Sequence, residues 1–189
     1  MSANEPGAAS YRVDGRRSRF VVKAFATGLL SAFGHSPTIA IRDFTGEVRF
    51  SPDHLDAAAL GLRIKAESLA VADDVRDSDR REMERQMREE VLETARYPEI
   101  VFESTSVAAE KVMDSQYRAR ISGNMSMHGV TRQCVIDAQV IAGEDTLRAN
   151  GEFPLRQSDF NIKQVSAVGG TIKLKDELKF SFDIVAYRQ

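Results

Sequence analysis

The feature that most constrains the fold of this chain is an alternation of apolar and polar residues, repeated in short runs along most of its length. In the segment 60–66 the even-numbered residues are apolar, whereas Arg63 and Lys65 fall on the opposite parity. The same period of two recurs over residues 100–104, 117–127, 134–140, 147–156 and 178–184. A period of two is typical of β-strands with one buried face. The sequence therefore predicts a mainly β protein whose strands each contribute one apolar face.

One segment breaks this rhythm. Residues 77–95 are rich in Arg, Glu and Met, contain neither Gly nor Pro, and carry apolar side chains four residues apart at Met83, Met87 and Val91. This spacing predicts one amphipathic α-helix over about 77–95. We expect a side-chain cap at its start from Asp77, Ser78 or Asp79. The charges of the helix, including Arg80 and Glu84, are expected to form a solvated face.

Strand counting indicates the architecture. Adding the shorter runs near residues 11–25, 38–50 and 170–175 gives about eight or nine strands. An open sheet of that size exposes aggregation-prone edges, and closure into a barrel removes them. We therefore expect a closed antiparallel β-barrel of about eight strands with one α-helix packed beside it. A single domain over residues 11–189 would follow a flexible N-terminal lead of residues 1–10.

The charge balance and hydropathy argue against two classes of partner. Lys and Arg number 26 against 28 Asp and Glu, a net charge of −2, which does not match the basic surface that nucleic acids require. Apolar runs do not approach the roughly 20 residues of a membrane-spanning helix. We expect neither nucleic-acid binding nor a membrane span. The first ten residues lack the pattern of a secretory signal, so the expectation from the sequence as written is a cytoplasmic protein.

Residue types with catalytic or metal-binding chemistry are sparse. Cys134 is the single cysteine, and the histidines His35, His54 and His128 are not spaced as a ligand pair. The common nucleophile, zinc, phosphate and dinucleotide motifs are absent from the sequence. We therefore expect no metal site, no catalytic residues and no enzymatic activity.

Five sequence blocks resemble a known family. They are Tyr11-x-Val13-Asp14 with Ser18-x-Phe20, Asp43-Phe44-Thr45-Gly46-Glu47-Val48, Tyr97-Pro98-x-Ile100-x-Phe102-x-Ser104, Gly123 to Thr131 with its His128-Gly129-Val130-Thr131, and Ser158-Asp159-Phe160-Asn161-Ile162. In this order they resemble the YceI-like family over residues 11 to about 187. The resemblance implies a lipocalin-like barrel with a helix beside it, which holds a long polyisoprenoid, often quinone-related. It also allows a homodimer.

The resemblance turns the inward-facing positions into candidate ligand contacts. From the strand parity these are Leu62, Ile64, Ile100, Phe102, Ile121, Met125, Ile136, Phe153, Phe180 and Phe182, joined by Phe33, His35 and Phe160 from loops. The expected function is the binding, storage or transport of a polyisoprenoid, quinone-like or fatty-acyl lipid, with no other cofactor. His35 is a candidate for a hydrogen bond to a ligand head group, although we favour a structural role in a turn. The alternative is an interaction module whose barrel is filled by its own side chains, since every barrel needs apolar inward residues.

Overall fold

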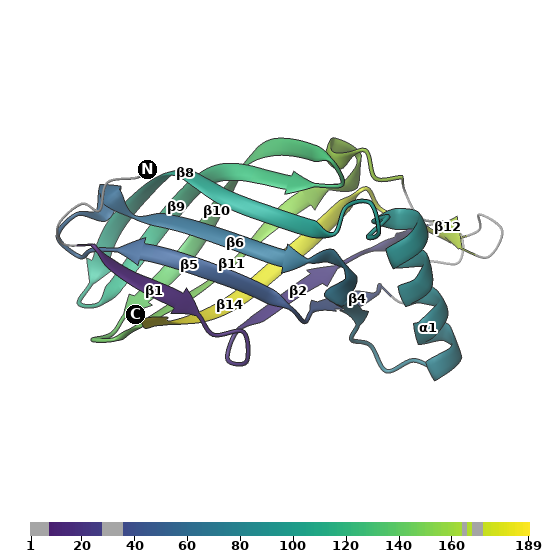
Figure 1. Cartoon of the computed structure of the whole chain (residues 1–189), viewed down its shortest axis with the longest axis horizontal. Helices are drawn as coiled ribbons and strands as arrows, with labels where there is room; N and C mark the ends of the chain where they lie inside the picture. Colours follow the sequence, from purple (N-terminus) through teal and green to yellow (C-terminus); the bar gives the residue numbers. More distant parts are fainter. Residues whose placement is uncertain (1–7, 28–35, 164–165, 168–171) are drawn as a thin grey trace.

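Eight antiparallel strands form the closed barrel that the sequence predicts. A computed structural model of the chain describes residues 8–27, 36–163, 166–167 and 172–189. Around the barrel the strands run β1 (Ala9–Val13), β5 (Phe44–Phe50), β6 (Ala59–Lys65), β8 (Glu99–Met113), β9 (Gln116–Met127), β10 (Val130–Ala142), β11 (Thr146–Arg156) and β14 (Glu177–Arg188) (Figure 1). Pairing of Tyr11 with Arg188 closes the ring between β1 and β14. β1 begins at Ala9, so the strand extends into the lead that the sequence predicts to be flexible.

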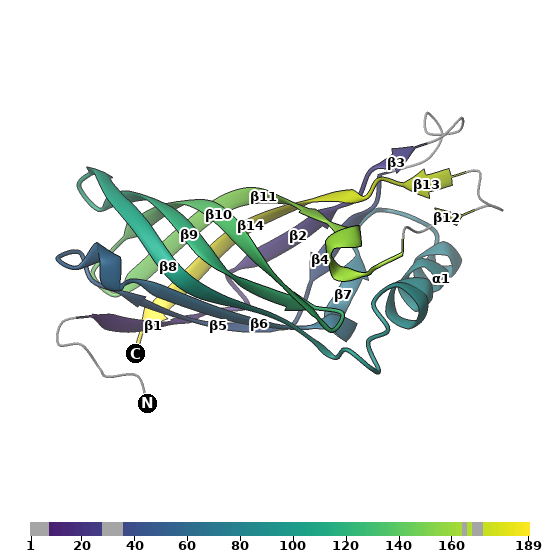
Figure 2. The ribbon, with the colours of Figure 1, turned by 90° about the horizontal axis from the view of Figure 1, so that it is seen from above.

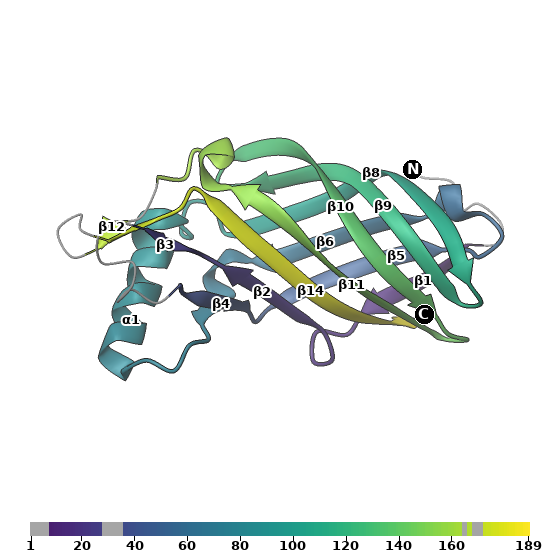
Figure 3. The ribbon, with the colours of Figure 1, turned by 180° about the vertical axis from the view of Figure 1, so that it is seen from behind.

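Three segments of the chain bend and contribute strands at both ends of the barrel. β14 pairs with β1 near its end and with β2 (Arg19–Lys23) nearer its start, so β1 and β2 follow one another along the same neighbour (Figure 3). In the same way β4 (Thr38–Ile41) leads into β5, and β6 leads through a short 3₁₀ turn, η2 (Ala66–Ser68), into β7 (Leu69–Val71). β2, β4 and β7 pair side by side, so they extend the wall beyond β14.

The remaining short elements lie at the two ends. The 3₁₀ turn η1 (Leu55–Ala57) joins β5 to β6, and η4 (Gln157–Phe160) follows β11 at the opposite end. Near η4 a small separate sheet pairs β12 (Ser166–Ala167), β13 (Ile172–Leu174) and β3 (Ala26–Thr27) (Figure 2). In the described part of the chain, the helices are too short or too polar to cross a lipid bilayer.

The single helix is shorter than the sequence predicts. α1 runs from Asp77 to Gln86 and continues as one π-helical turn, η3 (Met87–Val91), which ends four residues before Ala95. Two features explain the early end. Leu92 turns into the core, and Glu93 has a φ of +45°, in the left-handed region that a right-handed helix cannot contain.

The predicted side-chain cap is also wrong. Arg76 occupies the N-cap position and forms no cap with its side chain. The carboxylate of Asp79, which was expected to cap the first turn, instead accepts a hydrogen bond from Arg76 Nε at 3.1 Å.

The helix covers the exposed edge of β7 with charged side chains. Val71 N–H donates to Glu84 Oε1 at 3.0 Å, and Arg80 donates to the carbonyls of Val71 at 2.6 Å and Asp73 at 3.0 Å. Arg80 and Glu84 are thus not part of a purely solvated face, as expected from the sequence. They satisfy main-chain groups that a strand edge would otherwise leave open.

Candidate ligand cavity

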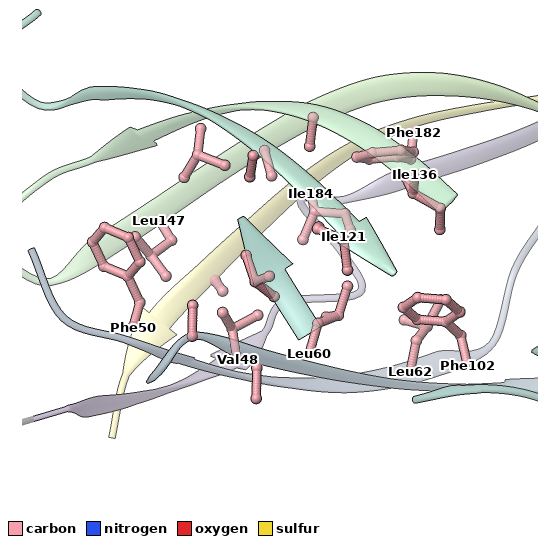
Figure 4. Close-up of a pocket in the computed structure, with 18 of the residues that line it drawn as sticks. Val48, Phe50, Leu60, Leu62, Phe102, Ile121, Ile136, Leu147, Phe182 and Ile184 are labelled. Atoms are coloured by element: carbon pink, nitrogen blue, oxygen red, sulfur yellow. The ribbon is translucent and has the colours of Figure 1, made fainter. Parts of the chain in front are cut away.

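A cavity of about 120 Å³ lies along the inside of the barrel. The surface that it exposes is wholly apolar. Figure 4 shows Phe182 and Ile136 on one wall opposite Leu62 and Phe102 on another. The lining residues are Phe20, Val48, Arg49, Phe50, Ala58, Ala59, Leu60, Leu62, Ile64, Ile100, Phe102, Val107, Ala109, Tyr117, Ala119, Ile121, Met125, Met127, Ile136, Ala138, Val140, Leu147, Ala149, Phe153, Phe180, Phe182, Ile184 and Ala186.

Strand parity positions most of this wall. Alternate residues of a strand face the same side, so Leu62 and Ile64 on β6 face inward while Arg63 and Lys65 are exposed. The long strand β8 is an exception because its register shifts between Ser104 and Ser106. A bulge inserts one extra residue and reverses the parity beyond it. The inward positions therefore change from even numbers at Phe102 to odd numbers at Val107 and Ala109.

Small residues on the inward face have two different roles. A side-chain carbon at Gly123 would lie 2.5 Å from Phe102 Cζ, and one at Gly151 would lie 2.7 Å from Phe182 Cζ. These glycines therefore make room for aromatic rings of neighbouring strands rather than for a ligand. Three alanines of the same parity do border free space, namely Ala119, Ala138 and Ala149.

Ten of the thirteen predicted contact residues line this cavity: Leu62, Ile64, Ile100, Phe102, Ile121, Met125, Ile136, Phe153, Phe180 and Phe182. Phe160 does not line it. That residue is 3% exposed in η4, within the packed core. Phe33 and His35 lie outside the described residues. Contact of any of these residues with a ligand stays a prediction.

Parity also explains which lining residues the sequence analysis missed. Leu60 and Ile184 lie on the apolar parity of the runs 60–66 and 178–184 but were not named as contacts. Ala186 continues the second run by one more inward position. Val107 and Ala109 could not be found this way because the bulge reverses the pattern before them. Ala58 and Ala59 adjoin η1, whose turn has no periodicity to read.

His128 holds loops together at the end of the barrel that carries η4. It adopts a φ of +52° in the tight turn between β9 and β10, next to Gly129 at +75°. Its Nδ1 lies 3.2 Å from the carbonyl oxygen of Phe160 and its Nε2 lies 2.9 Å from Glu93 Oε2. The ring also packs on Tyr97, with 4.6 Å between the ring centres. These contacts join the turn between β9 and β10 to η4 and to the loop that follows the helix. The role of His128 is therefore structural.

Carboxylates and lysines of the described strands lie on the outer face of the barrel, whereas Tyr117 and Cys134 face inward. Cys134 faces inward and is half-buried, and burial raises the pKa of its thiol, which makes it a poor nucleophile at neutral pH. His54 is exposed beside η1. Within the ranges that the structure describes, no three His, Cys, Asp or Glu side chains gather as a metal ion would require. An apolar solute inside the cavity would be buried and would contact apolar side chains, but it would meet no charged group.

The cavity is narrow for a long ligand. Ligand sites commonly enclose about 300–1,000 Å³, several times the free space present here. Because the wall is apolar, such a void stays dry. A long chain could occupy it only if side chains or strands moved apart.

A closed antiparallel barrel around an apolar central cavity defines a protein of the lipocalin-like barrel class. Comparison with known proteins agrees with this assignment of the fold. Residues 11–186 match the YceI-like domain, and the chain belongs to the YceI-like family.

Among sequence relatives, it is 30% identical to the UPF0312 protein of Azotobacter vinelandii, covering 87% of this chain and 82% of that protein. It is 28% identical to Protein YceI of Escherichia coli O157:H7, covering 86% and 81%.

Two solved structures share the fold. The crystal structure of Burkholderia cenocepacia BcnA matches with a TM-score of 0.71 at 17% identity, over 92% of this chain and 98% of that chain. The second is the structure of a polyisoprenoid binding domain from Saccharophagus degradans implicated in plant cell wall breakdown. It matches with a TM-score of 0.68 at 12% identity, over 96% and 99%.

Proposed function

We propose that this protein binds a long apolar molecule inside its barrel, and stores or carries it without acting on it chemically. The ligand class is a polyisoprenoid, a quinone-like lipid or a fatty-acyl chain. The observation that carries the proposal is the continuous apolar wall of the cavity. The Saccharophagus degradans domain of the same fold, described as polyisoprenoid-binding, supports the class of ligand.

The energetics of such a site favour chains over compact polar molecules. Removing apolar surface from water contributes about 25 cal/mol per Å², so affinity grows with the length of chain inserted. A wall that exposes only apolar surface selects for an apolar tail and leaves a polar head group at a mouth of the barrel. His35 is our candidate for contact with that head group.

Native mass spectrometry of the protein purified from its own host without detergent tests this function. We expect a reproducible adduct that is released on denaturation and is soluble in organic solvent. The same spectrum reports whether the protein is a homodimer. A mass equal to the bare chain, together with no uptake of added lipid, would contradict the proposal.

The small free volume favours one alternative. A barrel filled by its own side chains, acting through its surface on a partner protein, also fits a cavity of about 120 Å³. The two functions differ in what added lipid does. A filled barrel gains no thermal stability from it, whereas a ligand that binds only the folded state raises the unfolding temperature.

A further inference from the structure

The barrel wall has one side where main-chain pairing stops. β6 and β8 pair only from Gly61 opposite Glu103 to Lys65 opposite Glu99. The last link is a hydrogen bond of 2.8 Å from Leu60 N–H to Ser104 Oγ. Beyond it, residues 106–113 of β8 pair with β9 on one side and, among the described residues, with no strand on the other. We call the gap between residues 58–60 and this half of β8 the seam.

The cavity extends to the seam. Ala58, Ala59 and Leu60 on one side of it and Val107 and Ala109 on the other all line the cavity. In Figure 2 the far half of β8 rises away from β6, and the turn η1 lies at this end of the barrel. η1 packs against β8, so it lies beside the seam.

η1 is held weakly. Its main-chain hydrogen bonds are internal, from Ala57 N–H to His54 and from Ala58 N–H to Leu55. In the described part of the chain no main-chain hydrogen bond joins it to β8. Its attachment to the core is the partly buried side chains of Leu55 and Ala58. Segments with few apolar contacts and no ladder bonds open at low free-energy cost.

The surface beside the seam is apolar as well. At the end of the unpaired half of β8, the side chains of Val112 and Met113 are 52% and 56% exposed. Exposed apolar side chains thus lie at the far end of the same strand half whose Val107 and Ala109 line the cavity, with the charged Glu110 and Lys111 between them.

We propose that the seam is a side entrance to the cavity and that η1 is its gate. This inference rests on the proposed function. A long chain needs more room than the cavity offers, so part of the wall must move. Separating paired strands would break several main-chain hydrogen bonds, whereas moving η1 breaks none with β8. The apolar chain therefore enters between β6 and β8 when η1 swings out, and the wall widens there to hold it.

The test uses the rates of uptake and release of retinol, a C20 isoprenoid whose fluorescence rises in apolar surroundings. Leu55→Ser loosens η1 without altering the cavity wall, which Leu55 does not line. We expect both rates to rise about fivefold to tenfold, because removing the buried part of one leucine lowers the opening barrier. The Kd should stay within about twofold, because a gate changes rates rather than the bound state.

Leu178→Ser is the matched control. Leu178 is also partly buried against the core and not in the cavity wall, but it lies at the start of β14, at the opposite end of the barrel. Its substitution should leave both rates unchanged. Faster exchange in Leu178→Ser with unchanged rates in Leu55→Ser would overturn the side entrance and place the route at the other end.

A second variant closes the gate instead of loosening it. Cysteines are placed on the two sides of the seam, as Ala58→Cys with Ala109→Cys in a Cys134→Ser background, and formation of the disulfide is read by mass spectrometry. Uptake should be at least about tenfold slower in the oxidised than in the reduced form of the same protein, since a covalent tie blocks opening. Equal rates in the two forms would overturn the inference. Absence of retinol binding in the unmodified protein would instead count against the proposed function.

Discussion

At the scale of single residues, the glycines of the barrel differ in what surrounds them. Two pack against an aromatic ring, and a third faces open space. Gly123 and Gly151 lie directly beneath Phe102 and Phe182, whereas a side-chain carbon at Gly61 would meet no atom within 4 Å. Identical residues in strands of identical alternation therefore have opposite tolerance to substitution. The alternation places Gly61 on the outer face with Arg63. It could not show that the space beside the two inner glycines is filled, because each ring comes from another strand.

Gly123→Ala should destabilise the protein. The added carbon would lie 2.6 Å from the carbonyl oxygen of Glu103 as well as against Phe102, so main chain as well as side chain must shift. We expect the free energy of unfolding to fall by about 1–3 kcal/mol, as in overpacked cores, measured by urea denaturation. Gly61→Ala is the control, and it should be neutral or slightly stabilising because alanine restricts the unfolded chain. Equal losses in both variants would contradict this account.

The hydrogen bonds of Asp176 predict that the stability of the protein depends on pH. Its carboxylate accepts hydrogen bonds from Ser158 Oγ at 2.6 Å and Ser158 N at 2.8 Å, and these bonds lower the pKa of Asp176 below its ordinary 3.8. A lowered pKa in the folded state means that the stabilisation is complete above pH 3.8 and is lost as the pH falls through the folded value. The protein should therefore exceed Asp176→Asn in stability at pH 7, by a margin that shrinks below about pH 4.

Urea denaturation at several pH values between 7 and 3 measures that margin. Asp53→Asn removes one exposed carboxylate and controls for the change in net charge. A margin that is constant over the whole range would show that Asp176 contributes through packing and not through its charge.

At the scale of elements, the positions and buried faces of most strands could be predicted from the sequence. The bulges and bends that interrupt the strands could not. The alternation correctly assigned the faces of β6, β9, β10, β11 and β14, since each strand has one exposed face and one buried face. The bulge in β8 and the bends between β1 and β2 escaped prediction, because they are set by curvature of the whole barrel. The helix was found by its period, but its end was not, because burial of Leu92 depends on the strands around it.

The contact between α1 and β7 gives a test at this scale. Arg80→Ala removes two charge-assisted hydrogen bonds to strand-edge carbonyls, and such bonds contribute about 1.5–3 kcal/mol each at most. We expect lower stability and faster hydrogen exchange at the amide of Val71, whose acceptor Glu84 lies on the same helix. Arg85→Ala is the control. Arg85 pairs with Glu82, Glu89 and Glu90 in solvent, so its loss should leave Val71 exchange unchanged.

At the scale of the whole molecule, the barrel and its apolar interior could be predicted, and the free volume could not. Ten contact residues follow from parity, but the width of the cavity depends on how rings from several strands interlock. Phe153 stacks on Phe180 with 5.1 Å between ring centres, and Phe182 lies 5.9 Å from Phe20. No single strand contains that information.

Filling the interior should abolish ligand capacity while the fold persists. Ala138→Phe places a ring in the cavity that Ala138 lines, so we expect retinol binding to weaken at least about tenfold, equivalent to about 1.4 kcal/mol. Ala108→Phe adds the same ring to an exposed position on β8 and should bind normally. Circular dichroism and the urea midpoint establish that both variants fold. Undiminished binding by a folded Ala138→Phe protein would place the ligand outside the barrel.

The closure between β1 and β14 has a consequence for how the protein is made. Tyr11 pairs with Arg188, so β1 finds its second neighbour only after β14 has left the ribosome. Contacts so distant in sequence form slowly. Until then β1 presents an open edge to other chains in the cell. The nascent protein therefore depends on protection from aggregation at β1 until β14 has been made and pairs with it.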